Sequence, residues 1–326
     1  MRKVSGHIAF WACAVATLAV TPAAWAEDSD YPTKPVTVIV DRAPGGGTDI
    51  TARLMAQYLS KALGQQFIVE NQPGAAGRIA LQRLSGSAAD GYTLLVVGSS
   101  YTVNPALYKL EIDPVEGITP VVAISEGGLL LVASPKLAAK TLPDLLKQAK
   151  AEPGKITSAT VGSGSISDLS TALLELMAGA QFTHVEYKGA GPAMNDTMAG
   201  VTDILFSSPA NAIPQVKAGT LTALARTADV PMPGMAEAPT MQSAGVAGYN
   251  VLEWYGVIGP KGIPAAIVEK LNGAVNTMLK DPAIVANINR DGFVPAGGSA
   301  ADFKSRIATG IAQWSKVVQS MNIKAE

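Results

Sequence analysis

The stretch VTVIVDRAPGGGTDITARL, residues 36–54, gives the first indication of the fold. The β-branched run at 36–40 is typical of a buried strand, and the glycines at 45–47 separate it from a helical pattern that begins at Thr48. Glycine lets the backbone approach a ligand with no Cβ in the way. The first N–H groups of a helix, together with its dipole, attract anions. The stretch therefore predicts an anion-binding strand-to-helix turn, with a plain tight turn as the alternative.

The same strand and helix pattern continues along the chain in two series. The first series adds strands at 67–71 and 93–98 and a helix at 77–84; the second has strands at 156–162, 182–187 and 203–208 and helices at 167–177 and 191–198. Such alternation is typical of α/β domains with a mainly parallel sheet. In the open sheets of such domains, ligands bind outside the carboxyl ends of the strands.

The two series also correspond in sequence. APGGGTD aligns with TVGSGSISD, and DGYTLLVVGSS aligns with VTDILFSSPA. We interpret them as two topologically equivalent lobes, although chance similarity between units rich in glycine and alanine is the alternative.

Two extended apolar segments, 118–135 and 249–260, are the natural crossovers between the lobes. Helical patterns at 264–279 and 300–318 then complete the first lobe. The predicted division is lobe 1 at 27–124 plus 253–326 and lobe 2 at 125–252, with a ligand cleft between them.

Residues 1–26 have the pattern of a cleaved signal peptide, with a charged start, an apolar stretch and a small-residue site at Ala24-Trp25-Ala26. The alternative is a membrane anchor, but the apolar stretch has only about 17 residues and is interrupted by Pro22. We therefore expect an exported, water-soluble protein that begins near Glu27.

Removal of this segment takes away the only cysteine, Cys13, and leaves His184 as the only histidine. A disulfide framework, an ordinary zinc site and a thiolate nucleophile are thereby excluded. Loss of Arg2 and Lys3 changes the formal net charge from −1 to −3, which does not favour nucleic acid or an anionic membrane. We expect no metal and no cofactor.

Enzymatic motifs are also missing from the sequence. It contains no G-x-S-x-G elbow, and His184 lies in a strand pattern that favours a structural role. The glycine loops match neither the phosphate-binding P-loop nor the dinucleotide fingerprint. Asp41, Asp49, Asp90 and Asp203 have no spacing that defines a catalytic pair. We therefore expect no catalysis, and we interpret the glycine loops as carboxylate sites.

The mature chain resembles the TctC-like or Bug-type solute-binding proteins of tripartite tricarboxylate transporters. The similar motifs occur in family order: YPTKPVTVIV, APGGGTD, VENQPGAAG, DGYTLL, NPALY, LPDLLKQAK, HVEYKGAGPAM, IPQVKAG, APTMQSAG, WYGVIGPKGIP and QWSKVV. Any one of these motifs is weak, but the ordered set is specific.

The resemblance implies a two-lobed periplasmic binding protein of type II-like fold that closes on a small carboxylate. It implies a monomer that delivers this ligand to the large and small membrane subunits of a tripartite transporter. Two alternatives remain open on the same scaffold: an exported hydrolase of small esters, and a ligand sensor for a signalling kinase.

The resemblance also implies which residues bind the ligand, largely through backbone amides. They are Ala43, Pro44, Gly45, Gly46, Gly47, Thr48 and Asp49 in the first loop, Gly162, Ser163, Gly164 and Ser165 in the second, Ser99, Ser100, Tyr101 and Asn104 after the 93–98 strand, and Ser207 and Ser208.

The chain departs from the family pattern near this site. Asp41 and Arg42 stand where the family commonly has a proline and an aromatic residue, and Ser207 replaces a frequent acidic residue. Our hypothesis is that Arg42 binds a second ligand carboxylate in bidentate fashion. The ligand would be a di- or tricarboxylate, aliphatic or aromatic such as terephthalate, on whose ring Tyr101 could stack. In the alternative, Arg42 points to solvent or pairs with Asp41 or Asp49, and Tyr101 lies at the surface.

Overall fold

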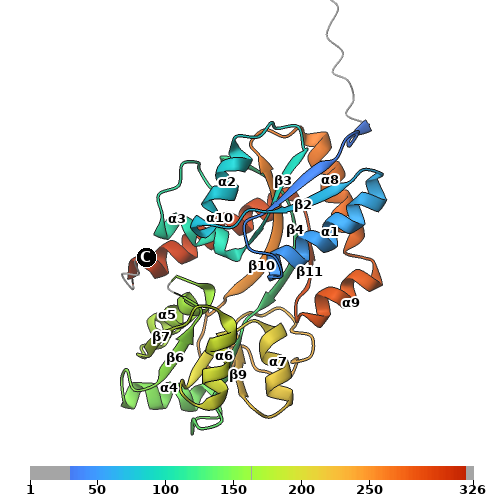
Figure 1. Cartoon of the computed structure of the whole chain (residues 1–326). Helices are drawn as coiled ribbons and strands as arrows, with labels where there is room; N and C mark the ends of the chain where they lie inside the picture. The colour runs from blue at the N-terminus through green and yellow to red at the C-terminus, as the bar shows by residue number, and fades with distance from the viewer. Residues whose placement is uncertain (1–29, 163, 321–326) are drawn as a thin grey trace, which may run out of the picture.

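The computed structural model describes residues 30–162 and 164–320, so the expected signal peptide at 1–26 lies outside the described residues. The described chain forms two sheets flanked by helices, which occupy the upper and lower parts of Figure 1. Across 30–162 and 164–320, no helix is both long and apolar enough to span a bilayer.

The first sheet has the order β11-β4-β10-β3-β1-β2. Its strands are β1 (Val36–Val40), β2 (Phe67–Asn71), β3 (Thr93–Gly98), β4 (Ile118–Gly128), β10 (Leu252–Pro260) and β11 (Val294–Gly297). β2 and β3 run parallel to β1, whereas β10, β4 and β11 follow in antiparallel pairs. The sheet is therefore mixed rather than mainly parallel, because the crossover strands β4 and β10 pair with each other.

The second sheet has the order β7-β6-β8-β5-β9. Its strands are β5 (Leu130–Ala133), β6 (Thr157–Thr160), β7 (Thr183–Glu186), β8 (Ile204–Ser207) and β9 (Thr222–Arg226). β7 and β8 run parallel to β6, and β5 is antiparallel to both β8 and β9. The series β2-β1-β3-β10-β4 thus repeats as β7-β6-β8-β5-β9, which confirms the predicted topological equivalence.

We call the first sheet and its covering helices lobe 1. β1 alternates in the manner of a buried strand: Val38 packs on the side of α1 (Gly47–Leu63) and α8 (Ala265–Met278), and Ile39 packs on the other side. That other side is covered by α2 (Arg78–Ser85) and by the first half of α10 (Ala300–Ser320), which contributes Phe303 and Ile307. Both faces of the sheet are therefore buried.

We call the second sheet and its helices lobe 2. α4 (Leu142–Ala151) and α5 (Ile166–Ala178) cover one face, and α6 (Ala190–Ala199) and α7 (Pro209–Lys217) cover the other. Trp314, Val317 and Val318, near the end of α10, belong to the core cluster of lobe 2. The last helix, α10, therefore packs on both lobes. The domain limits predicted from the sequence stay a prediction.

The connections between the lobes are short and central. β4 continues into β5 with only Leu129 between them, and β10 returns beside β4. The turn from β1 into α1 and the turn from β6 into α5 lie at the carboxyl ends of inner strands, where ligands of open α/β sheets bind.

Candidate ligand-binding site

The first glycine loop is held by a buried carboxylate at the start of α1. Asp49 Oδ2 accepts hydrogen bonds from the Gly45 N–H at 2.9 Å and from Arg53 Nε at 3.0 Å, and Oδ1 accepts one from Asn71 Nδ2 at 2.8 Å. Burial acts to raise the pKa of Asp49, but the hydrogen bonds from Arg53, Gly45 and Asn71 lower it to about 2. Asp49 therefore holds the first glycine loop in place through the Gly45 N–H.

The second glycine loop uses the same arrangement at the start of α5. Asp168 Oδ2 accepts from the Gly164 N–H at 2.9 Å, and Oδ1 lies 2.6 Å from His184 Nδ1. Ser165 caps the helix by accepting from the Asp168 N–H. Asp49 and Asp168 each lie four residues after the glycine that they hold. Ser163, the remaining predicted residue of this loop, lies outside the described residues.

His184 has the structural role that its strand position predicted. Its second ring nitrogen, Nε2, lies 3.4 Å from Glu175 Oε2. Hydrogen bonds to Asp168 and Glu175 raise the pKa of His184 to about 9, so the ring is charged at neutral pH. The imidazolium thus balances the carboxylate that holds the second loop.

A cavity of about 450 Å³ opens between the two loops and receives residues from both lobes. Its lining is Arg42, Gly47, Thr48, Ala76, Gly98, Ser99, Ser100, Val103, Asn104, Leu107, Tyr108, Val161, Gly164, Ser165, Ile166, Glu253 and Tyr255. Within the described residues no side chain caps α1, so its first N–H groups are available at the wall that Gly47 and Thr48 form. The cavity is therefore suited to an anion held between two helix N-termini.

Arg42 lies at this cavity and its side chain is 41% exposed. Its Nη2 donates to Ser100 Oγ at 2.6 Å, and its Nε lies 3.7 Å from Asp41 Oδ2. The alternative in which Arg42 pairs with Asp41 is therefore supported in part, because the two residues form an ion pair. Asp41 itself is buried, and burial raises its pKa more than Arg42 lowers it. The guanidinium is the cationic group of the cavity lining.

The predicted site residues divide into three groups. Arg42, Gly47, Thr48, Ser99, Ser100, Asn104, Gly164 and Ser165 line the cavity described above. Gly45, Gly46 and Ser208 line an adjoining cavity of about 490 Å³, which shares Gly47 and Tyr255 with the first. Ala43, Pro44, Asp49, Tyr101, Gly162 and Ser207 line neither cavity.

Tyr101 is the clearest departure from expectation. It is only 4% exposed and packs in the lobe 1 core, and its hydroxyl donates to the Pro114 carbonyl at 2.7 Å. Neither ring stacking on a ligand nor the surface position fits this placement, because the turn after β3 directs the side chain inward. Ser207 is likewise buried at the end of β8, 5% exposed.

Several cavity residues were missed by sequence reasoning. Glu253 and Tyr255 come from the crossover strand β10, and Leu107 and Tyr108 come from α3 (Asn104–Leu107) and the residue after it. An acidic residue inside the apolar segment YNVLEWYGVIGP was the available signal for Glu253.

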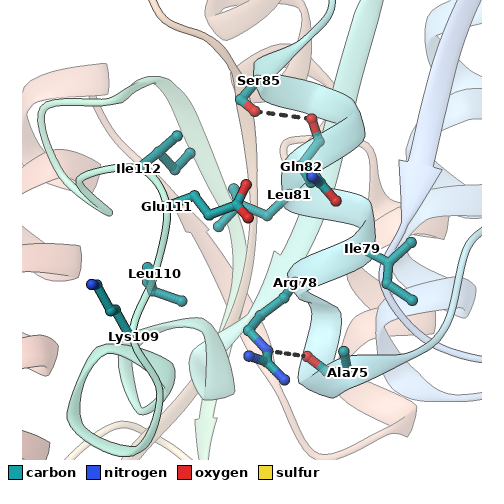
Figure 2. Close-up of a pocket in the computed structure, with 10 residues that line it drawn as sticks. All are labelled: Ala75, Arg78, Ile79, Leu81, Gln82, Ser85, Lys109, Leu110, Glu111 and Ile112. Atoms are coloured by element: carbon teal, nitrogen blue, oxygen red, sulfur yellow. Dashed lines mark hydrogen bonds between the residues drawn. The ribbon is translucent and has the colours of Figure 1, made fainter.

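A separate depression lies on lobe 1 alone, between α2 and residues 109–112 (Figure 2). It has a volume of about 230 Å³, and its lining includes Arg78, whose Nε donates to the Ala75 carbonyl. It contains neither glycine loop and no residue of lobe 2, so the interlobe cavity is the better candidate site.

Two α/β lobes joined by paired crossover strands, with a cavity between two helix N-termini, define the class of two-lobed periplasmic binding proteins. The model of the tripartite tricarboxylate transporter family receptor, TctC, matches residues 51–323. The chain therefore belongs to the TctC family of solute-binding receptors.

Relatives and solved structures agree with this family. Protein BugT of Bordetella pertussis is 34% identical over 297 residues, which are 90% of this chain and 91% of BugT. R. palustris Rpa4515 with adipate is 32% identical at a TM-score of 0.78, with 90% of this chain and 99% of that chain covered. MatC from Rhodopseudomonas palustris with bound malate is 31% identical at a TM-score of 0.74, with 88% and 100% covered.

Proposed function

We propose that this protein captures a small dicarboxylate in the interlobe cavity and delivers it to the membrane subunits of a tripartite transporter. The observation that carries the proposal is that two glycine loops, one from each lobe, line one cavity together with Arg42. One ligand carboxylate would bind the helix N-terminal amides of the loops, and the second would bind the guanidinium.

The ligands of two relatives support this substrate class. Adipate and malate, named with Rpa4515 and MatC, are both dicarboxylates. A contact that joins the lobes through the ligand favours the closed form, and closure around a ligand is how two-lobed binding proteins signal occupancy to a partner. Export by the predicted signal peptide would place the receptor in the periplasm.

A thermal-shift and calorimetry panel tests the proposal. The dicarboxylates are adipate, malate, succinate and terephthalate. The matched monocarboxylates are hexanoate for adipate, benzoate for terephthalate and butanoate for the two four-carbon acids. At least one dicarboxylate should raise the melting temperature in a concentration-dependent way and bind at least tenfold more tightly than its monocarboxylate counterpart. Equal binding of mono- and dicarboxylates, or binding of neither, would contradict the proposal.

A further inference from the structure

Glu253 places an acidic side chain in the wall of a cavity that is otherwise built for an anion. It lies on β10, one of the two strands that join the lobes. Its Oε1 accepts a weak hydrogen bond from the Tyr255 hydroxyl at 3.4 Å, and its buried Oε2 has no hydrogen-bond partner among the described residues. A buried, ionised carboxylate with one unpaired oxygen is costly, whereas a neutral carboxyl group is much less so.

Among the described residues no cation forms an ion pair with Glu253. On the adjacent strand β4, Glu126 is engaged by Arg306 of α10, and Gly127, the strand partner of Glu253, packs against the Phe293 ring. The remaining charged or titratable groups nearby are Arg42 and Tyr108 in the cavity lining and Asp291, whose charge, like that of Arg42, acts on Tyr255.

Burial therefore dominates the ionisation of Glu253. Burial raises the pKa of Glu253, and the hydrogen bond from the Tyr255 hydroxyl offsets only part of this rise. The resulting pKa is about 7. In the cavity of the free protein, the neutral and ionised forms are thus close in free energy near neutral pH. A ligand that interacts differently with the two forms will select one of them.

An anionic ligand should select the neutral form. An ionised Glu253 would repel a carboxylate in the same cavity, whereas a neutral carboxyl group can donate a hydrogen bond to it. The opposite role, acceptance from a ligand ammonium or hydroxyl, fits the lining less well, because Arg42, the loop amides and the serine hydroxyls together favour an anion.

We propose that Glu253 is a specificity residue that donates a hydrogen bond from its neutral carboxyl group to a ligand carboxylate, so that capture of the ligand takes up a proton. This inference rests on the proposed function. It adds a contact between the ligand and Glu253 of the crossover strand β10 that depends on protonation. Because the donor must be protonated, affinity should fall as pH rises above 7.

Calorimetry of the wild-type protein measures this proton directly. The probe is the tightest-binding member of the panel adipate, malate, succinate and terephthalate, titrated at pH 8 in HEPES and in Tris, whose ionisation enthalpies differ. We expect uptake of close to one proton per ligand bound, and an affinity that falls by up to about tenfold between pH 7 and pH 8. Binding at pH 8 without proton uptake would overturn the inference and leave the proposed function intact, whereas no binding of any panel member would overturn both.

Two variants distinguish donation from acceptance. Glu253→Gln keeps a permanent N–H donor, so its affinity should be independent of pH between 6 and 8 and should exceed that of the wild type at pH 8. Glu253→Ala has no donor and should lose affinity at pH 6 by about tenfold. A Glu253→Gln protein that folds but loses binding at pH 6 would show that the ligand needs a carboxylate acceptor, and the inference would be wrong.

Discussion

At the residue scale, the binding loops depend on charged side chains that do not themselves line the main cavity. Asp49 and Asp168 each accept a hydrogen bond from a glycine N–H of their loop. Arg53 is the cationic partner of Asp49, and His184 is that of Asp168. Sequence reasoning treated Asp49 as a ligand contact and His184 as structural. The structure assigns to Asp49, and to Asp168 with His184, the task of holding one glycine N–H of each loop, whereas the first N–H groups of α1 have no side-chain cap among the described residues.

Arg42 is the residue on which the dicarboxylate preference should depend. Arg42→Ala should weaken binding of the cognate dicarboxylate by about 1.5–3 kcal/mol, the usual range for a hydrogen bond to a charged group. The monocarboxylate counterpart should lose much less. Calorimetry of the variant beside Arg83→Ala, which removes an equal charge from a surface ion pair with Glu70, measures the difference. A loss below about 1 kcal/mol would show that Arg42 does not bind the ligand.

His184 should make stability depend on pH through the second loop. The pKa of His184 is raised from 6.5 to about 9 in the folded protein, so its stabilisation is complete below about pH 6.5 and is lost as the pH rises through 9. Urea unfolding should therefore show a gap between wild type and His184→Gln on the order of 3 kcal/mol at pH 6. The gap should close toward pH 10, and a gap of equal size at both pH values would argue against a charged histidine.

At the scale of elements, the start of α1 is packed tightly against the crossover strand β10. A Cβ on Gly47 would clash with the Tyr255 hydroxyl oxygen, whereas a Cβ on Gly46 would meet nothing nearer than the Ala43 carbonyl at 3.9 Å. The turn and the strand therefore pack closely and together form one wall of the site.

Gly47→Ala should accordingly destabilise the protein by about 1–3 kcal/mol, as overpacking does. Gly46→Ala is the matched control, and its free energy of unfolding should stay within about 0.5 kcal/mol of the wild type. Tyr255→Phe should recover part of the Gly47→Ala loss in the double variant, because it removes the clashing oxygen. Equal unfolding free energies for the two alanine variants would contradict this packing.

The elements were largely predictable because local pattern determines them. β1, β2 and β3 match their predicted ranges, and α1 begins one residue earlier than expected. α4, α7, β9 and β11 had no counterpart among the predicted elements. α9 (Pro282–Arg290) was also missed, although Asp281 caps it. Strand pairing was less predictable, since the antiparallel β4–β10 pair joins residues far apart in sequence.

Side-chain direction limited the prediction of the site. The glycine loops line the cavities through their backbone atoms, and consecutive glycines in the sequence show where the backbone carries no side chains. Tyr101 and Glu253 could not be placed in this way. The turn after β3 directs Tyr101 into the core, and the orientation of β10 places Glu253 at the cavity. The residues that distinguish ligands are therefore the ones that a single sequence predicts least well.

At the scale of the whole molecule, the proposed function requires one ligand to contact both lobes. The two lobes repeat one strand order, and each presents a helix N-terminus to the same cavity. β4 passes into β5 with only Leu129 between them, and α10 packs on both cores, so we expect the lobes to move relative to each other by a hinge about these connections.

A crystal structure with the tightest-binding dicarboxylate of the panel tests this central claim most directly. We predict that one carboxylate lies within hydrogen-bond distance, directly or through one water, of amides at the start of α1 (46–48) and at the start of α5 (166–167), and that the other contacts Arg42. A ligand bound to one lobe alone, or in the depression between α2 and residues 109–112, would contradict the account.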